Sequence, residues 1–171
     1  MKNNQYTLTQ LNQISQEDFT TALGEIWEET PEIANQTWHN KPFEDLEALY
    51  RAMVAVVENM SEIQQLDLIK AHPDLGSKTK MADASVREQS GVGLDRLSKS
   101  EYARFQSLNQ AYKDKFGFPF IIAVKYHTKE SILEAFETRL QNSQEAEKQE
   151  ALSEISRIAR LRLEAIIDDR N

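Results

Sequence analysis

The sequence predicts an all-α fold, a single-domain helical bundle of about seven to eight helices with one short buried extended segment. Its 171 residues suffice for one hydrophobic core, and 40% of them are apolar. With only 5 Gly and 4 Pro, the chain has little material for a turn-rich β fold. Apolar residues instead recur at helical spacing. We therefore treat residues 1–171 as one domain, in which residues 1–10 form a short polar lead.

Two helices are predicted in the first third of the chain. Ser15 stands three residues before Asp18, a spacing typical of a capping box, and the helical stripe that follows ends before Pro31. A second stripe runs over residues 43–57. The apolar residues of the two stripes are Phe19, Leu23, Ile26 and Trp27, then Phe43, Leu46, Leu49, Tyr50, Met53, Val54 and Val57. Both patterns predict amphipathic helices with one face in the core.

A third helix and a long loop follow. Ser61 and Gln64 form a second capping-box pattern. This helix must end near His72, because Pro73 disfavours helical geometry in the residue before it. Residues 73–84 are polar and aperiodic, so we expect a loop there, and loops often carry functional residues.

The second half of the chain is predicted to contain helices on both sides of an extended segment. A short helix starts at Ser85 and breaks at Gly91, and a longer one covers about residues 100–112. Residues 116–124 are apolar but contain Gly and Pro, which favours a buried extended segment over a helix. Two further helices are expected over residues 131–140 and 145–168.

The last predicted helix carries an arginine on its apolar side. Leu152, Ile155, Ala159, Leu163 and Ile166 cluster on one face, whereas Arg157, Arg160 and Glu164 fall opposite. Arg162 falls inside the apolar face. Because a buried arginine without a partner is costly, Arg162 should meet either a carboxylate of the protein or an anionic ligand.

The composition narrows the classes of function. A net charge of −8 opposes binding to nucleic acid or to anionic membranes, and an anionic small substrate would need a local positive group. The chain has no cysteine, which excludes disulfides, thiolate nucleophiles and Cys-ligated zinc. No apolar run approaches the length of a membrane span, and no signal or peroxisomal motif is found. We expect a soluble, cytoplasmic protein.

Among the three histidines, His72 is the best candidate for acid/base chemistry. It sits at a helix end, is restricted by Pro73 and opens the long polar loop. The alternative is that His72 only caps the helix C-terminus, where positive charge is favourable. His39 and His127 flank expected helix starts and are interpreted as surface or capping residues.

Ser85, Glu88 and Gln89 form a second candidate group. At i, i+3 and i+4 they share one helical face and could converge on a polar ligand. The alternative is that Ser85 and Glu88 are simply a capping box. Asp67, His72 and Asp74 lack the spacing of a helical zinc motif, so no metal site is expected.

Four sequence elements together resemble the OHCU decarboxylase family, whose substrate is 2-oxo-4-hydroxy-4-carboxy-5-ureidoimidazoline. Their order and spacing fit across about residues 10–167. The elements are Ala71-His72-Pro73-Asp74-Leu75-Gly76, then Ser85-Val86-Arg87-Glu88-Gln89-Ser90-Gly91 with Gly93-Leu94, then Phe116-Gly117-Phe118-Pro119-Phe120-Ile121-Ile122-Ala123-Val124-Lys125, and Ile158-Ala159-Arg160-Leu161-Arg162-Leu163.

The resemblance implies a helical enzyme, usually a homodimer, that forms (S)-allantoin in urate breakdown without a metal or an organic cofactor. His72 matches the catalytic histidine of the family, and Glu88 would assist it or bind the substrate. An association with the preceding enzyme, hydroxyisourate hydrolase, is open. The residues that match substrate-binding positions are Pro73, Ser85, Gln89, Arg162 and the segment Phe120, Ile121, Ile122 and Ala123.

Two alternatives stay open from the sequence. The chain could be a helical protein-interaction module in which His72 is only a cap. It could also be a decarboxylase of a related ureido acid, which would use Arg162 on another substrate.

Overall fold

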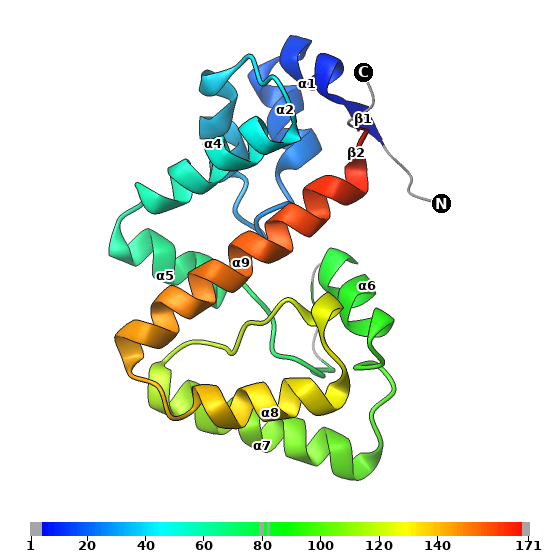
Figure 1. Cartoon of the computed structure of the whole chain (residues 1–171), viewed down its shortest axis with the longest axis vertical. Coiled ribbons are helices and arrows are strands. Elements are labelled where there is room, and N and C mark those ends of the chain that lie inside the picture. Colours follow the sequence, from blue (N-terminus) through cyan, green and yellow to red (C-terminus); the bar gives the residue numbers. More distant parts are fainter. Residues whose placement is uncertain (1–4, 79–80, 82, 169–171) are drawn as a thin grey trace. The chain divides into compact units, whose positions relative to one another are not determined.

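The computed structural model describes residues 5–78, 81 and 83–168 and confirms the predicted helical fold (Figure 1). The predicted loop over residues 73–84 lies partly outside these residues, as does the start of the predicted polar lead. The helices are α1 (Leu8–Gln13), α2 (Gln16–Leu23), α3 (Glu32–Thr37), α4 (Leu46–Glu58), α5 (Glu62–Lys70), α6 (Asp83–Gly91), α7 (Lys99–Phe116), α8 (Lys129–Arg139) and α9 (Gln144–Ile166). Short 3-10 turns are η1 (Trp38–Asn40) and η2 (Val124–Tyr126), and the strands are β1 (Tyr6–Thr7) and β2 (Ile167–Asp168).

The chain divides into two compact units. Unit 1 comprises residues 1–68 and 156–171, and unit 2 comprises residues 69–155. Helix α9 contributes to both, because its first half belongs to unit 2 and its second half to unit 1. The single domain over residues 1–171 stays a prediction, and the units are described separately below.

Unit 1 contains a small parallel sheet that the sequence did not predict. Tyr6 pairs with Ile167 and Thr7 with Asp168. Helix α9 therefore ends at Ile166 instead of Asp168. Thr7 also caps α1, which begins at Leu8, inside the stretch expected to be a polar lead. Leu8 and Leu11 are buried, which explains why this stretch is ordered onto the core.

The core of unit 1 follows the predicted apolar stripes. Ser15 caps α2 by accepting a hydrogen bond from the Asp18 backbone N–H, as expected. The helix ends at Leu23, earlier than the stripe suggested, although Trp27 remains 1% exposed. Its indole N–H donates to the Met53 sulfur at 3.3 Å, so a buried polar group is satisfied without a solvent contact.

Unit 2 is built around α7 and α8, which pack side by side (Figure 1). Ser98 and Glu101 form a capping box at the start of α7. Gly117 ends this helix with a φ of +80°, a left-handed conformation that favours glycine. Unit 2 also contains a cluster of aromatic residues. Its members are Phe105, Tyr112, Phe116, Phe118, Phe120 and Phe136, and all are buried.

The predicted buried extended segment is confirmed in unit 2. Residues 118–123 form neither helix nor strand, and Phe120 is fully buried with its ring stacked on Phe136 at 3.8 Å between centroids. An irregular segment in a core has no neighbouring strand to bond its backbone, so side chains must do so. Within the described residues, no helix is long and apolar enough to cross a membrane.

The capping box at α7 predicts a pH dependence of stability. The Ser98 backbone N–H and then the Lys129 ammonium, 3.1 Å away, lower the pKa of Glu101 from its ordinary value of 4.5. A pKa lowered in the folded state stabilises the protein fully above pH 4.5, and this contribution is lost as pH falls below that value. Glu101→Gln should therefore lower the free energy of unfolding at pH 7 but much less near pH 3.

Urea unfolding at both pH values checks this expectation. Glu134→Gln, at an exposed position of α8, is the matched control and should change stability little at either pH. A deficit of Glu101→Gln that is equal at both pH values would show that charge on Glu101 contributes nothing.

Candidate active site

His72 lies just beyond the end of α5, as the sequence predicted. Ser61 and Gln64 begin this helix with the expected reciprocal hydrogen bonds, of 2.9 and 3.2 Å. The His72 backbone N–H donates to the Ile69 carbonyl at 3.2 Å, which closes the last turn. The histidine is only 7% exposed. This burial distinguishes His72 from a helix cap at the surface. Burying a titratable side chain costs free energy, because the side chain loses its contacts with water.

The loop after His72 is held by a side chain from α6. Gln89 accepts a hydrogen bond from the Gly76 N–H at 2.9 Å through Oε1. Its Nε2 group donates to the Asp74 carbonyl at 3.4 Å. Gln89 was expected to bind substrate, but in this structure its amide bonds the backbone of the loop that starts at His72.

Helix α7 fixes the same loop from a second direction. Asn109, which is buried, donates to the Leu75 carbonyl at 2.9 Å. Lys113 contacts the Asp74 carboxylate at 2.7 Å. These two contacts and those of Gln89 hold residues 74–76, which follow His72 directly in the chain. No sequence motif had pointed to Asn109 or Lys113.

The loop after His72 requires a glycine at position 76. Its φ is +69°, and a Cβ atom built on it would lie 2.7 Å from Cδ1 of Leu97. Both the backbone conformation and the neighbouring side chain therefore oppose any larger residue.

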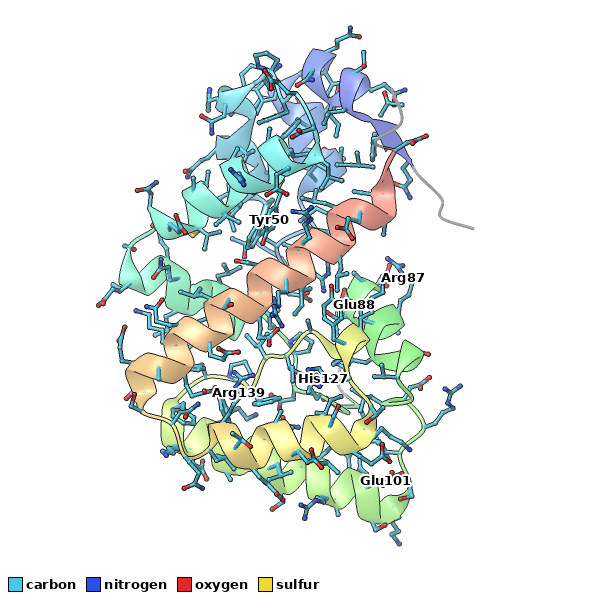
Figure 2. All side chains as sticks on the ribbon, viewed as in Figure 1. Tyr50, Arg87, Glu88, Glu101, His127 and Arg139 are labelled. Carbon is cyan, nitrogen blue, oxygen red and sulfur yellow. The ribbon has the colours of Figure 1, made fainter. Side chains whose placement is uncertain are left out.

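The face of α6 that carries Ser85, Glu88 and Gln89 forms as predicted. Ser85 is 5% exposed and Glu88 is half-buried, and Figure 2 shows Glu88 and Arg87 on α6. The capping-box interpretation of Ser85 is wrong, because α6 begins at Asp83 and Ser85 lies within its first turn. Ser85 and Glu88 each have contacts within the protein.

The predicted substrate segment, Phe120 to Ala123, is buried along its whole length. The Ile121 carbonyl accepts a hydrogen bond from Nη1 of Arg139 at 2.6 Å. The Ala123 N–H donates to Oε2 of Glu154 at 3.3 Å. Helix α6 contacts η2, which directly follows this segment. The segment and the loop after His72 thus both adjoin α6 within unit 2.

Arg139 and Glu147 form a buried ion pair that the sequence analysis missed. Nε of Arg139 lies 2.8 Å from Oε1 of Glu147 (Figure 2 labels Arg139). The Tyr112 hydroxyl donates to the same oxygen at 2.5 Å, and burial followed by this bond raises the pKa of Tyr112. The sequence does contain a pattern that predicts the burial of Arg139, because Ile132, Phe136 and Arg139 recur at helical spacing on one face.

Arg162 belongs to unit 1 and is 8% exposed, which confirms its predicted position on the buried side of α9. Its Nη2 group lies 2.8 Å from the carboxylate of Glu28, which is also buried. Nη1 donates to the Glu25 carbonyl at 3.3 Å. Of the two partners expected for Arg162, the structure supplies the protein carboxylate. The burial of Arg162 alone therefore does not imply that this residue binds an anionic ligand.

The remaining histidines fit their expected capping and surface positions. His127 follows η2, and its Nδ1 lies 2.9 Å from the hydroxyl of Ser131 (Figure 2). His39 is exposed and contacts Gln16. Across the described residues, no three His, Asp or Glu side chains lie close enough to hold a metal ion.

Comparisons with known proteins agree with the motifs. A family model described as OHCU decarboxylase matches residues 12–164. The chain is 46% identical over 160 residues to 2-oxo-4-hydroxy-4-carboxy-5-ureidoimidazoline decarboxylase of Halalkalicoccus jeotgali, covering 94% of this chain and 91% of that protein. It is also 46% identical over 165 residues to the uric acid degradation bifunctional protein PucL of Bacillus subtilis, covering 96% of this chain but 33% of that protein.

A solved structure described as (S)-allantoin synthase has a TM-score of 0.77 and 32% identity to this chain. The match covers 94% of this chain and 54% of the synthase, so this chain spans about half of that protein. The family model matches most of the chain, and the identity to the Halalkalicoccus jeotgali decarboxylase is 46% over 160 residues. The chain belongs to the OHCU decarboxylase family.

Proposed function

We propose that His72 is the acid/base group of this chain, an OHCU decarboxylase that produces (S)-allantoin in urate degradation. The observation that supports this role is the burial of His72 at the head of a loop that two helices hold in place. A histidine titrates near neutral pH and can both take and give a proton during one reaction.

The chemistry places modest demands on the protein. The bond between the ring carbon and the carboxylate breaks, CO₂ leaves, and the electron pair enters the conjugated carbon–nitrogen and carbonyl system of the substrate. Because a carboxylate departs as neutral CO₂, the reaction takes up one proton overall. The enzyme must hold the carboxylate out of the ring plane, assist movement of the hydroxyl proton and protonate one face of the resulting carbon. The substrate itself accepts the electron pair, so this step needs no separate electron sink.

The residues of α6 and the adjoining segment would orient the substrate in unit 2. We assign Glu88 to position the His72 imidazole or to bind ring and ureido N–H groups, and Ser85 to add a hydrogen bond. Gln89 already uses one amide N–H and its oxygen on the loop, so it contributes one further N–H at most. Pro73 shapes the pocket beside the histidine. Backbone groups of Phe120 to Ala123 complete the contacts.

Arg162 would hold the substrate carboxylate in our proposal. A guanidinium has five N–H donors in a planar fork, a geometry that matches the two oxygens of a carboxylate. Arg162 lies within residues 12–164, which the family model matches. An acidic chain needs such a group to bind an anion.

Further features of the proposal concern assembly and location. We propose a homodimer that acts in the cytoplasm, in functional association with a hydroxyisourate hydrolase. The bifunctional Bacillus subtilis relative, named for uric acid degradation, supports a link to other steps of that pathway.

The role of His72 predicts that His72→Asn abolishes catalysis while the fold persists. Loss of a general acid/base group typically slows turnover by about 100-fold or more. Circular dichroism can follow the build-up of one allantoin enantiomer after urate is oxidised and hydrolysed in situ. His39→Asn, at an exposed histidine, is the matched control and should behave like the wild type. Turnover by His72→Asn at the wild-type rate would remove His72 from catalysis, and another group would then have to move the proton.

The role of Arg162 predicts a binding defect. Arg162→Lys keeps the positive charge beside Glu28 but loses the planar fork, so KM for OHCU should rise about tenfold while the protein stays folded. Steady-state kinetics with parallel thermal unfolding separates the two effects. An unchanged KM would show that Arg162 pairs with Glu28 but does not bind the substrate carboxylate.

The homodimer predicts a sedimenting species of twice 19.7 kDa. Analytical ultracentrifugation at micromolar concentration checks this expectation. A single species of 19.7 kDa with full activity would rule out a required dimer.

A further inference from the structure

We propose that the buried Arg139–Glu147 ion pair is a positioning device that fixes the backbone of Phe120 to Ala123 and so determines which face of the substrate is protonated. This inference rests on the proposed function, in which that segment contacts the substrate. Arg139 is 7% exposed and Glu147 is fully buried. Neither residue stands in the motifs that carry the family resemblance.

The contacts of Arg139 converge on the segment. Nη1 donates to the Ile121 carbonyl at 2.6 Å, and Nε pairs with Glu147 at 2.8 Å. The guanidinium carbon lies 4.3 Å from the centroid of the Phe120 ring. Arg139 thus holds both the backbone and a side chain of the segment.

Glu147 is in turn fixed from three sides. Its Oε1 atom accepts from the Tyr112 hydroxyl at 2.5 Å as well as from Arg139. Its Oε2 atom accepts from Nδ2 of Asn142 at 2.9 Å. Both carboxylate oxygens are therefore occupied, and the orientation of the Arg139 fork follows from α7, α9 and the turn between α8 and α9.

Stability alone does not account for this pair. Well-packed apolar residues are often as stabilising as a buried ion pair, because two charges must lose their hydration. The surroundings already include the aromatic rings of Tyr112, Phe120 and Phe136. One Arg139 nitrogen, Nη2, is buried without a hydrogen-bond partner among the described residues, which adds to the cost. What an apolar pair could not provide is a donor for the Ile121 carbonyl.

A second anchor acts two residues further along the segment. The Ala123 N–H donates to Glu154 at 3.3 Å. In an extended backbone, the N–H and C=O groups of successive residues point to opposite sides. With Ile121 and Ala123 bonded to the protein, the polar groups of Ile122 between them should face the other way.

The Ile122 backbone has the character of a ligand-binding group. Ile122 is 5% exposed, yet no hydrogen bond of its N–H or C=O occurs within the described part of the chain. Buried backbone groups are almost always paired in native structures. A bound substrate with carbonyl and N–H groups on its ring and ureido arm would pair with them. The anchors on either side set the direction of these two groups.

The positioning role has a kinetic signature that a structural role lacks. A substrate bound by backbone groups is oriented only as well as those groups are, and a displacement of about 1 Å can reduce the rate about 100-fold. A loosened segment would let the ring tilt and accept the proton on both faces. Losing Arg139 should thus lower kcat and the excess of (S)-allantoin while changing KM little.

The test compares Arg139→Met with Arg104→Met, which removes an arginine from an exposed ion pair with Glu137 in the same unit. We expect Arg139→Met to reduce kcat by about 10- to 100-fold, with KM within a few-fold of wild type. The enantiomeric excess, corrected for the spontaneous reaction, should fall as well. Arg104→Met should match the wild type in all three measurements.

Two more variants keep the test decisive if Arg139→Met does not fold because Glu147 is left unpaired. The double variant Arg139→Met with Glu147→Gln removes both charges but keeps an amide oxygen that can accept from the Tyr112 hydroxyl, so the protein should fold while kcat and enantiomeric excess still fall. Arg139→Lys keeps a positive charge and N–H donors but loses the planar fork, so it should recover part of kcat and part of the enantiomeric excess. A folded double variant with wild-type kcat and product handedness would overturn the proposal.

Running His72→Asn in parallel separates the two hypotheses. If His72→Asn is inactive and the Arg139 variants are normal, only the positioning role fails. If His72→Asn is active, the assignment of His72 fails, whereas a loss of handedness in the Arg139 variants would still support the anchor.

Discussion

Buried backbone that is not helical must find hydrogen-bond partners among side chains, and the organisation of unit 2 depends on this constraint. The loop after His72 and the segment from Phe120 to Ala123 are both irregular. Helix α7 supports both: Asn109 bonds the loop directly, and Tyr112 reaches the segment through Glu147 and Arg139. One helix therefore supports two segments that are about fifty residues apart in the sequence and that we propose contribute to the active site.

The helices could be predicted because their signals are local. The capping pairs Ser15 with Asp18 and Ser61 with Gln64 lie within single turns, and both begin helices in the structure. The pairing of β1 with β2 joins the two ends of the chain and spans two residues on each strand, too few for a pattern. The early end of α2 was missed for a related reason, since Trp27 is buried by tertiary packing after the helix has stopped.

The candidate site was predicted in part. Position at a helix end and a following proline singled out His72, and periodicity put Arg162 on a buried face. The same periodicity places Arg139 on the buried stripe of α8 with Ile132 and Phe136. Glu28 and Glu147, the carboxylates that pair with these arginines, could not be predicted. The chain has 28 acidic residues, and which of them are buried depends on how distant segments pack together. The bonds from the Gln89 amide to residues 74 and 76 could not be predicted either, because they join segments that only the tertiary structure brings together.

The pairing of each of these buried arginines with a buried glutamate affects how an anion approaches. Neither pair carries a net charge, so the field felt at a distance is that of a chain with eight surplus negative charges. At physiological ionic strength, the anionic OHCU feels this repulsion mainly within about 8 Å of the protein surface, because charges farther apart are screened. Hydrogen bonds formed on contact are much less sensitive to dissolved ions. Moderate salt should consequently speed the arrival of this substrate, the reverse of the behaviour of enzymes that attract anions with exposed lysines and arginines.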